Sequence, residues 1–144
     1  MSVDVISEIE IRCPLREVAA FTTNPDNAPT WYVNITSVEW RTPRPVQVGS
    51  RVAFVAQFLG QRLEYTYEFV ELVPEERLVM RTSEGPFPME TTYTWQATPD
   101  GTRMQLRNRG VPKGFSLLMA PLMARAVRKA NRKDLAALKK HLEG

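Results

Sequence analysis

The hydrophobic pattern of the chain is strand-like over most of its length and helix-like at its end. Residues 3–11 and 35–109 alternate between apolar and polar side chains, which is the spacing of a β-strand with one buried face. Turn-forming residues interrupt the second stretch at 43–49, 60–61, 74–76, 85–86 and 99–101. Such interruptions are typical of hairpins, so we predict a mostly antiparallel meander preceded by one N-terminal strand.

Three of these turns allow the strand register to be predicted. A two-residue loop at residues 60–61 places Leu59 opposite Arg62, and the turns at 73–76 and 98–101 extend the pairing. The expected inward pairs are Phe58 with Leu63, Phe54 with Tyr67, Phe69 with Met80, Tyr67 with Thr82, and Ala97 with Thr102. In all three hairpins one face collects aromatic and aliphatic side chains and the other face is polar. A one-residue slip would mix the two sets, so the register is well specified.

Helical spacing appears before and after the meander. Pro14 precedes Leu15, Val18 and Phe21, which predicts a short helix ending near residues 22–24, and residues 24–32 form a second short helical piece. Residues 115–142 predict a long helix that Pro121 starts or kinks. Its apolar side is Met123, Val127, Ala130, Leu135, Leu138 and Leu142. An apolar sheet face needs a cover. We therefore predict one α+β domain over residues 1–144, a seven-stranded antiparallel sheet curved around the C-terminal helix.

The net charge of +3 is concentrated on that last helix. Its outer side carries Arg125, Arg128, Lys129, Arg132, Lys133, Lys139 and Lys140, against the single acid Asp134. Two interpretations stay open: a solvated outer face, or peripheral contact with an anionic membrane through the five bases from Arg125 to Lys133. Aromatic residues are not interleaved with these bases and no nucleic-acid motif accompanies them, so we do not expect a nucleic-acid partner.

The rarer residue types exclude several classes of protein. Cys13 and His141 are the single cysteine and histidine, so we expect no disulfide, no metal site and no cofactor, and a structural or incidental role for both. No run of 18 apolar residues is present, and the N-terminus lacks a basic start followed by an apolar block. These features lead us to expect a cytoplasmic protein.

The ordered set of segments resembles the START-like, or SRPBCC, superfamily, whose fold is the helix-grip fold. The matching pieces are residues 13–21, Trp31, residues 48–52, residues 69–78, the Gly101-Thr102 pair and residues 134–143. The nearest likeness is to the polyketide cyclase/dehydrase-like group. The resemblance implies an elongated pocket between the sheet and the terminal helix, and it leaves the activity open because the superfamily includes carriers, cyclases and chaperone activators.

The inward aromatic face has two interpretations, a solid core or the wall of a ligand cavity. Hydroxyl and amide groups on the same face favour a cavity, because an apolar pocket with a few convergent polar groups is what a small-molecule site requires. The predicted lining is Trp31, Phe54, Phe58, Tyr65, Tyr67, Phe69, Met80, Thr82, Thr91, Tyr93, Trp95, Met104, Leu106, Asn108, Met123 and Val127.

Three functions follow from this cavity. The first is binding of a small hydrophobic, aromatic or lipid-like molecule, with its transport as an extension of that role. The second is a polyketide cyclase or dehydratase, for which the catalytic candidates are Tyr65, Tyr93, Asn108 and Asp26, the last expected near the pocket mouth. The third is a protein-interaction module, which predicts a solid core. Inward acids and bases are scarce in the predicted register, so the sequence favours binding over chemistry.

Overall fold

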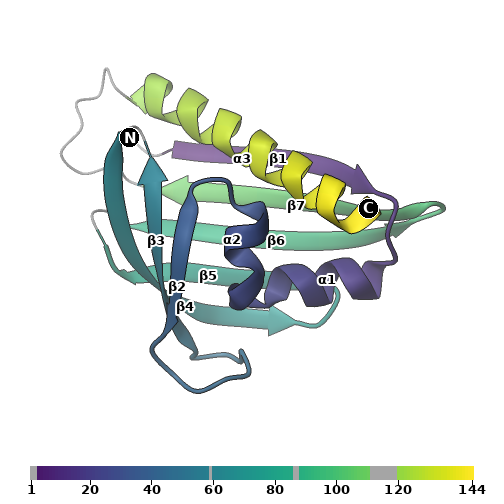
Figure 1. The fold of residues 1–144 in the computed structure, drawn as a ribbon, viewed down its shortest axis with the longest axis horizontal. Helices are drawn as coiled ribbons and strands as arrows, with labels where there is room; N and C mark the ends of the chain where they lie inside the picture. Colours follow the sequence, from purple (N-terminus) through teal and green to yellow (C-terminus); the bar gives the residue numbers. More distant parts are fainter. Residues whose placement is uncertain (1–2, 59, 86–87, 111–119) are drawn as a thin grey trace.

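The computed structural model describes residues 3–58, 60–85, 88–110 and 120–144. Its seven strands form one antiparallel sheet in the order β1-β7-β6-β5-β4-β3-β2. The strands are β1 (Val3–Ile11), β2 (Ile35–Trp40), β3 (Arg51–Phe58), β4 (Gln61–Val73), β5 (Arg77–Glu84), β6 (Met89–Thr98) and β7 (Gly101–Gly110). The helices are α1 (Leu15–Thr23), the single 3-10 turn η1 (Pro25–Asn27), α2 (Ala28–Trp31) and α3 (Ala120–Glu143). The sheet curls around α3, while α1 and α2 close its open side (Figure 1). The predicted fold class is therefore confirmed.

The strand pairing agrees with the predicted register at two hairpins and corrects the third. Ala97 lies opposite Thr102 between β6 and β7, as predicted. Phe69 with Met80 and Tyr67 with Thr82 are also paired between β4 and β5. Between β3 and β4 the prediction was wrong by two residues: Phe58 lies opposite Gln61, Ala56 opposite Leu63 and Phe54 opposite Tyr65. Because the side-chain period of a strand is two, this shift leaves every side chain on its predicted face.

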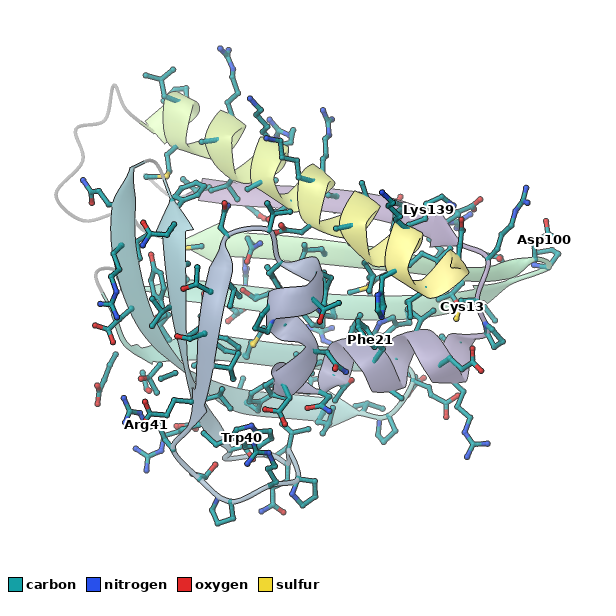
Figure 2. The ribbon with its side chains drawn as sticks, viewed as in Figure 1. Cys13, Phe21, Trp40, Arg41, Asp100 and Lys139 are labelled. Atoms are coloured by element: carbon teal, nitrogen blue, oxygen red, sulfur yellow. The ribbon has the colours of Figure 1, made fainter. Side chains whose placement is uncertain are left out.

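The terminal helix is amphipathic in the predicted sense. Its inner side places Met123, Leu135 and Leu138 in the core, while Arg125, Arg128, Lys129, Arg132 and Lys133 are exposed on its outer side. Lys139 near the C-terminal end donates to the carbonyl oxygen of Glu10 at 2.9 Å, which ties α3 to β1 (Figure 2). The predicted helix began at residue 115, and residues 115–119 lie outside the described ranges. None of the helices in the described ranges is both long and apolar enough for a membrane span.

The first helix is anchored against the sheet where β1, β6 and β7 meet. The indole Nε1 of Trp95 donates to the Thr22 hydroxyl of α1 at 3.1 Å, and Thr102 donates to the Cys13 carbonyl oxygen at 2.8 Å. A Cβ at Gly101 would lie 2.1 Å from the carbonyl oxygen of Ile11. Glycine is therefore required there, because any side chain would push β7 away from the end of β1.

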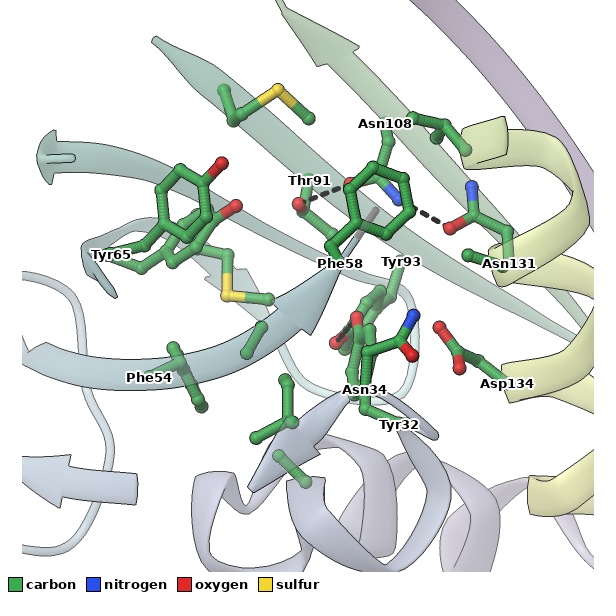
Figure 3. A pocket seen from close by; sticks show the side chains of 18 of the residues that line it. Tyr32, Asn34, Phe54, Phe58, Tyr65, Thr91, Tyr93, Asn108, Asn131 and Asp134 are labelled. Atoms are coloured by element: carbon green, nitrogen blue, oxygen red, sulfur yellow. Dashed lines mark hydrogen bonds between the residues drawn. The ribbon is translucent and has the colours of Figure 1, made fainter. Parts of the chain in front are cut away.

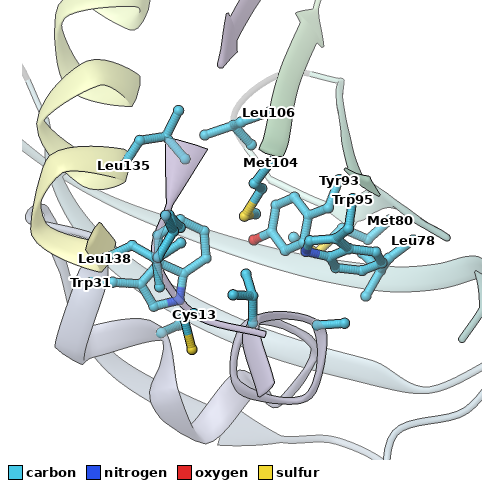
Figure 4. Packing of buried hydrophobic residues seen from close by; sticks show 14 of the residues in the cluster. Cys13, Trp31, Leu78, Met80, Tyr93, Trp95, Met104, Leu106, Leu135 and Leu138 are labelled. Atoms are coloured by element: carbon cyan, nitrogen blue, oxygen red, sulfur yellow. The ribbon is translucent and has the colours of Figure 1, made fainter. Parts of the chain in front are cut away.

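A tightly packed hydrophobic cluster fills the space between these elements. Figure 4 shows its members coming from α2, α3 and the inner face of the sheet. The fully buried side chains that do not border any hollow include Ile11, Leu78, Met104, Leu106, Leu135 and Leu138. This cluster includes Val18 and Ala19 of α1 and Leu135 and Leu138 of α3, two helices that lie over the same face of the sheet in Figure 1. We call it the packed end.

Candidate functional site

A cavity of about 170 Å³ lies between the inner face of the sheet, α2 and the N-terminal half of α3 (Figure 3). An apolar cavity of about 150 Å³ is large enough to hold a benzene molecule. We call this region the hollow end. The predicted lining residues that border it are Trp31, Phe54, Phe58, Tyr65, Tyr67, Phe69, Met80, Thr91, Tyr93, Asn108, Met123 and Val127.

Four predicted lining residues lie elsewhere. Trp95, Met104 and Leu106 face inward as predicted, but they are buried in the packed end, because α1 and the C-terminal half of α3 cover that part of the sheet. Thr82 pairs with Tyr67 as predicted, but its hydroxyl accepts a hydrogen bond from the Met89 backbone N–H at 3.0 Å. These four positions correct the predicted lining.

Asp26 does not lie at the mouth of the cavity, so this prediction was wrong. Its carboxylate accepts from Trp40 Nε1 at 2.8 Å and from the Arg44 guanidinium at 3.0 and 3.1 Å. These two partners hold the pKa of Asp26 below its usual value. Together with Trp40 and Arg44, Asp26 lines a separate, open surface groove. An acid occupied in this way is unsuited to proton transfer in the cavity.

A hydrogen-bonded chain of three side chains crosses one wall of the cavity. The Thr91 hydroxyl donates to Asn108 Oδ1 at 2.6 Å, and Asn108 Nδ2 donates to Asn131 Oδ1 at 3.0 Å. The chain leads from β6 through β7 to α3 (Figure 3). Its last atom, Asn131 Nδ2, is buried and has no acceptor among the residues that the structure describes. A buried N–H without a partner is costly, and Ser7 Oγ and Trp31 Nε1 are the other buried side-chain atoms of the described residues in this situation.

One helical turn further along α3, the carboxyl group of Asp134 also borders the cavity. Its side chain is 4% exposed, and Oδ1 accepts a hydrogen bond from the Val33 backbone N–H at 2.8 Å. Burial raises the pKa of Asp134 from 3.8 to about 7, only partly opposed by the Val33 hydrogen bond. Asp134 is thus a carboxyl group that changes charge near neutral pH.

Tyrosine hydroxyls complete the polar part of the cavity. Tyr32 at the end of α2 and Tyr93 on β6 share a short hydrogen bond between their hydroxyl groups. Burial raises the pKa of both phenols, and it raises the pKa of Tyr65 to about 12. Near neutral pH these groups are therefore neutral hydroxyls, each able to donate and accept a hydrogen bond.

Cys13 and His141, for which we expected a structural or incidental role, do not line the cavity. Cys13 is buried in the hydrophobic core, its Sγ donates to Glu17 at 3.2 Å, and burial raises its pKa to about 11. His141 is exposed and its ring lies 4.9 Å from that of Phe21. Within the described ranges, no group of His, Cys, Asp or Glu side chains is arranged to hold a metal ion.

The sequence interpretation missed Asn131 and Asp134, although a signal for both was present. Asn131 follows Val127 by four residues, and Asp134 precedes Leu138 by four, so both lie in the apolar stripe of the helix. A polar residue inside such a stripe faces either a buried partner or a ligand. Tyr32 and Asn34 also line the cavity. They belong to the irregular stretch around α2, where no periodicity predicts which side chains point inward.

The comparisons with known proteins agree with this geometry. A family model described as "Polyketide cyclase / dehydrase and lipid transport" matches residues 2–143, and the chain therefore belongs to that family. None of the curated protein sequences matches the chain.

Solved structures share the fold at low sequence identity. A START superfamily protein from Mycobacterium smegmatis superposes with a TM-score of 0.84 at 14% identity, covering 97% of each chain. The Zhui aromatase/cyclase from a Streptomyces species gives a TM-score of 0.82 at 15% identity, covering 99% of this chain and 94% of the other. A major latex-like protein from Panax ginseng gives 0.77 at 10% identity, covering 99% of each. At these identities the likeness establishes the START-like fold.

Proposed function

We propose that this protein is a carrier that binds a small hydrophobic, aromatic or lipid-like molecule in the cavity between the sheet and α3. The observation that supports this proposal is the cavity itself, about 170 Å³ in volume and lined mainly by aromatic and aliphatic side chains. Two pairs of aromatic rings pack edge to face in the cavity wall. The ring centroids of Trp31 and Tyr93 are 5.7 Å apart, and those of Phe54 and Tyr67 are 5.9 Å apart. A guest of one or two rings fits this volume. The family description, with its reference to lipid transport, is consistent with this proposal.

The test compares two variants in which an alanine of the same helix is replaced by phenylalanine. Ala130 lines the cavity, whereas Ala136 is exposed on the outer side of α3. Naphthalene, followed by its own fluorescence, should bind saturably to the wild-type protein and to Ala136→Phe. Ala130→Phe, which fills the cavity, should weaken binding at least tenfold. Native mass spectrometry of the purified protein reports any ligand already bound. Absence of saturable uptake, or equal uptake by both variants, would end the carrier proposal.

A second candidate function, a polyketide cyclase or dehydratase, is favoured by Asp134. A general base works best when its pKa lies near the working pH, and burial places that of Asp134 at about 7. In an aldol cyclisation the Asp134 carboxylate would take a proton from the carbon beside a carbonyl. The electron pair would form an enolate, stabilised by hydrogen bonds from Asn131 Nδ2 or a tyrosine hydroxyl. Attack on a second carbonyl forms the carbon–carbon bond, and Asp134 returns its proton to the new alkoxide.

The enzymatic alternative predicts turnover of an aromatic polyketide intermediate. Asp134→Asn should lower kcat by about a hundredfold or more while KM changes little, because the substitution removes the base and keeps the size of the side chain. Changes at Tyr65, Tyr93 or Asn108 should also reduce turnover. Asp26→Asn, in the separate groove, serves as the control and should retain full activity. Binding without turnover in the wild-type protein would favour the carrier.

The protein-interaction module requires a solid core, and the cavity supports the other two functions over it. A peripheral membrane contact is compatible with both. The exposed bases Arg125, Arg128, Lys129, Arg132 and Lys133 lie on the outer side of α3, and Leu122, 53% exposed, lies one turn before them. Sedimentation with phosphatidylserine vesicles should show binding that weakens as salt is raised, and it should be absent with neutral vesicles.

A further inference from the structure

We propose that Asn131 and Asp134 together bind the polar end of the molecule in the cavity. They select a neutral ligand that carries a hydrogen-bond acceptor and a hydrogen-bond donor close together. This inference rests on the proposed function, because it requires a guest in the cavity. It goes further by naming the chemistry that the guest must carry and the two side chains that recognise it.

Asn131 is the reason why the ligand must carry a hydrogen-bond acceptor. Its side chain is 4% exposed, its Oδ1 is occupied by Asn108 Nδ2, and its Nδ2 has no acceptor within the described ranges. The preceding members, Thr91 and Asn108, hold the amide in one orientation because each is hydrogen-bonded to the next. A carbonyl oxygen of the guest would satisfy this donor, whereas a pure hydrocarbon would leave it unpaired at the cost of a buried polar group.

Asp134 is the reason why the ligand must carry a hydrogen-bond donor. Residues three apart on a helix project on the same side, and Asn131 and Asp134 both border the cavity, with the Asn131 amide oxygen on the side toward Asp134 (Figure 3). One carboxyl oxygen accepts from the Val33 N–H, and the group retains further acceptor capacity, because a carboxyl has several lone pairs. An N–H or O–H of the guest would use it.

The charges of the described lining residues favour a neutral guest over an anionic one. Of the described residues that line it, none is Lys, Arg or His, and Asp134 is the sole acid. A carboxylate or phosphate would therefore lose its hydration without gaining a cation, and it would face Asp134. The raised pKa of Asp134 agrees with this picture, since the carboxyl group itself finds no cation there. The described lining therefore favours a neutral polar group over a fatty-acid carboxylate or a phosphorylated headgroup at this end of the cavity.

The class that fits is a small ring compound with a carbonyl next to an N–H or O–H, such as a lactam or a hydroxy ketone. Three bicyclic probes separate the possibilities. Quinolin-2(1H)-one carries the acceptor and donor on one edge, naphthalene carries neither, and 2-naphthoate is an anion. Calorimetric or fluorescence titrations with each probe at pH 5 and pH 8 measure the selection directly.

Two variants and one control complete the design. Asn131→Leu removes the amide at similar volume, Asp134→Asn removes the charge, and Arg132→Leu changes an exposed neighbour on the same helix. Asn131→Leu should weaken quinolinone binding about tenfold, the value of one buried hydrogen bond, while naphthalene binds as well or better. Asp134→Asn should strengthen naphthoate binding at pH 8 and not at pH 5, where the wild-type carboxyl is protonated. Arg132→Leu should leave quinolinone and naphthalene binding unchanged.

The outcomes distinguish this inference from the proposed function. Saturable naphthalene uptake with equal quinolinone affinity in the wild type and Asn131→Leu would overturn the inference and leave the proposed function standing. Naphthoate binding at pH 8 as tight as quinolinone binding would overturn it as well. If none of the three probes binds, both proposals fall. Unchanged naphthalene binding in Asn131→Leu also shows that the variant is folded, so a loss confined to quinolinone is evidence for recognition.

Discussion

The two ends of the space between sheet and helix share one inward face but differ in what fills it. At the packed end, Trp95, Met104 and Leu106 are buried in one cluster with residues of α1 and of the C-terminal half of α3, and none of the three lines the cavity. At the hollow end, the wall on the inner face of the same sheet bounds a cavity of about 170 Å³. Strand alternation therefore determines which side chains face inward, whereas a second layer determines whether the space they face is closed.

The polar groups of the two ends differ in the same way. At the packed end, Thr102 and Trp95 each find a partner within the protein, at 2.8 and 3.1 Å. At the hollow end, the Thr91–Asn108–Asn131 chain ends on an amide nitrogen without an acceptor among the described residues. Packing at one end stabilises the fold, and the chain at the other end stops at a donor that is free for the proposed ligand.

Shortening one side chain at each end should give the largest contrast in stability. Leu138→Ala, at the packed end, should lower the free energy of unfolding by about 3–4 kcal/mol, because it opens a new void in a closed core. Met123→Ala, which enlarges a cavity already present, should lower it by about 1–2 kcal/mol. Urea denaturation with unchanged m-values measures both. Equal losses would mean that the two ends are packed alike.

The pH dependence of stability should come from the hollow end, through Asp134. Its folded pKa, about 7, lies above its unfolded value, so its favourable contribution is complete below about pH 4 and is lost as the pH rises to 7. Asp134→Asn never ionises and keeps an acceptor for Val33. It should be more stable than the wild type by about 2–4 kcal/mol at pH 8, at about 1.4 kcal/mol per pKa unit, and equally stable at pH 4.

The titratable groups that face Asp134 are the Tyr32 and Tyr93 hydroxyls, which stay neutral throughout this pH range because burial raises the pKa of both. Asp100→Asn, in the exposed β6–β7 turn, provides the control and should show no such pH-dependent gain. A constant difference between wild type and Asp134→Asn from pH 4 to pH 8 would contradict the assigned burial of this carboxyl group.

Two isosteric threonine substitutions sharpen the polar side of the comparison. Thr102→Val leaves the Cys13 carbonyl oxygen unpaired and should cost about 1–2 kcal/mol of stability without changing ligand affinity. Thr91→Val releases Asn108 Oδ1, so it should cost a similar amount and also change quinolinone affinity. Unfolding and binding titrations of the same samples separate the two effects. If only Thr102→Val changed the ligand affinity, ligand binding would have to be assigned to the packed end and not to the hollow end.

The smallest effect is expected outside both ends, at the surface groove. Asp26→Asn weakens an exposed ion pair with Arg44, so stability should fall by about 0.5 kcal/mol or less at pH 7. Naphthalene affinity should be identical to that of the wild type. A loss of binding would place a ligand in the groove that Asp26 lines instead of the cavity.

Much of the fold was predictable from the sequence, because strand alternation survives errors in register. The β3–β4 hairpin was displaced by two residues from its predicted pairing, yet Phe54 and Phe58 still face the cavity. The error in register comes from the place of Gly60 in the turn. Gly60 has a positive φ of 75° and is the second of the two residues between the paired Phe58 and Gln61. The prediction had placed it first.

The candidate site was predictable on the sheet and less so on the helix. Alternation identified Tyr65, Tyr67, Thr91 and Asn108, but it could not tell that Trp95 faces a filled space, since that depends on where α1 packs. Asp134 was counted only as the single acid among many bases. Its place in the apolar stripe of α3 becomes informative once the cavity opposite it is known.

The central claim, that a guest occupies the hollow end, is tested most directly by mapping the amide chemical shifts of the protein during a naphthalene titration. The largest shifts should fall at Thr91, Asn108, Asn131 and Asp134, with small ones at Met104 and Leu138. Saturation of these shifts at a single affinity is the predicted result. Shifts centred on Asp26 and Arg44, or no saturable shifts at all, would contradict the account.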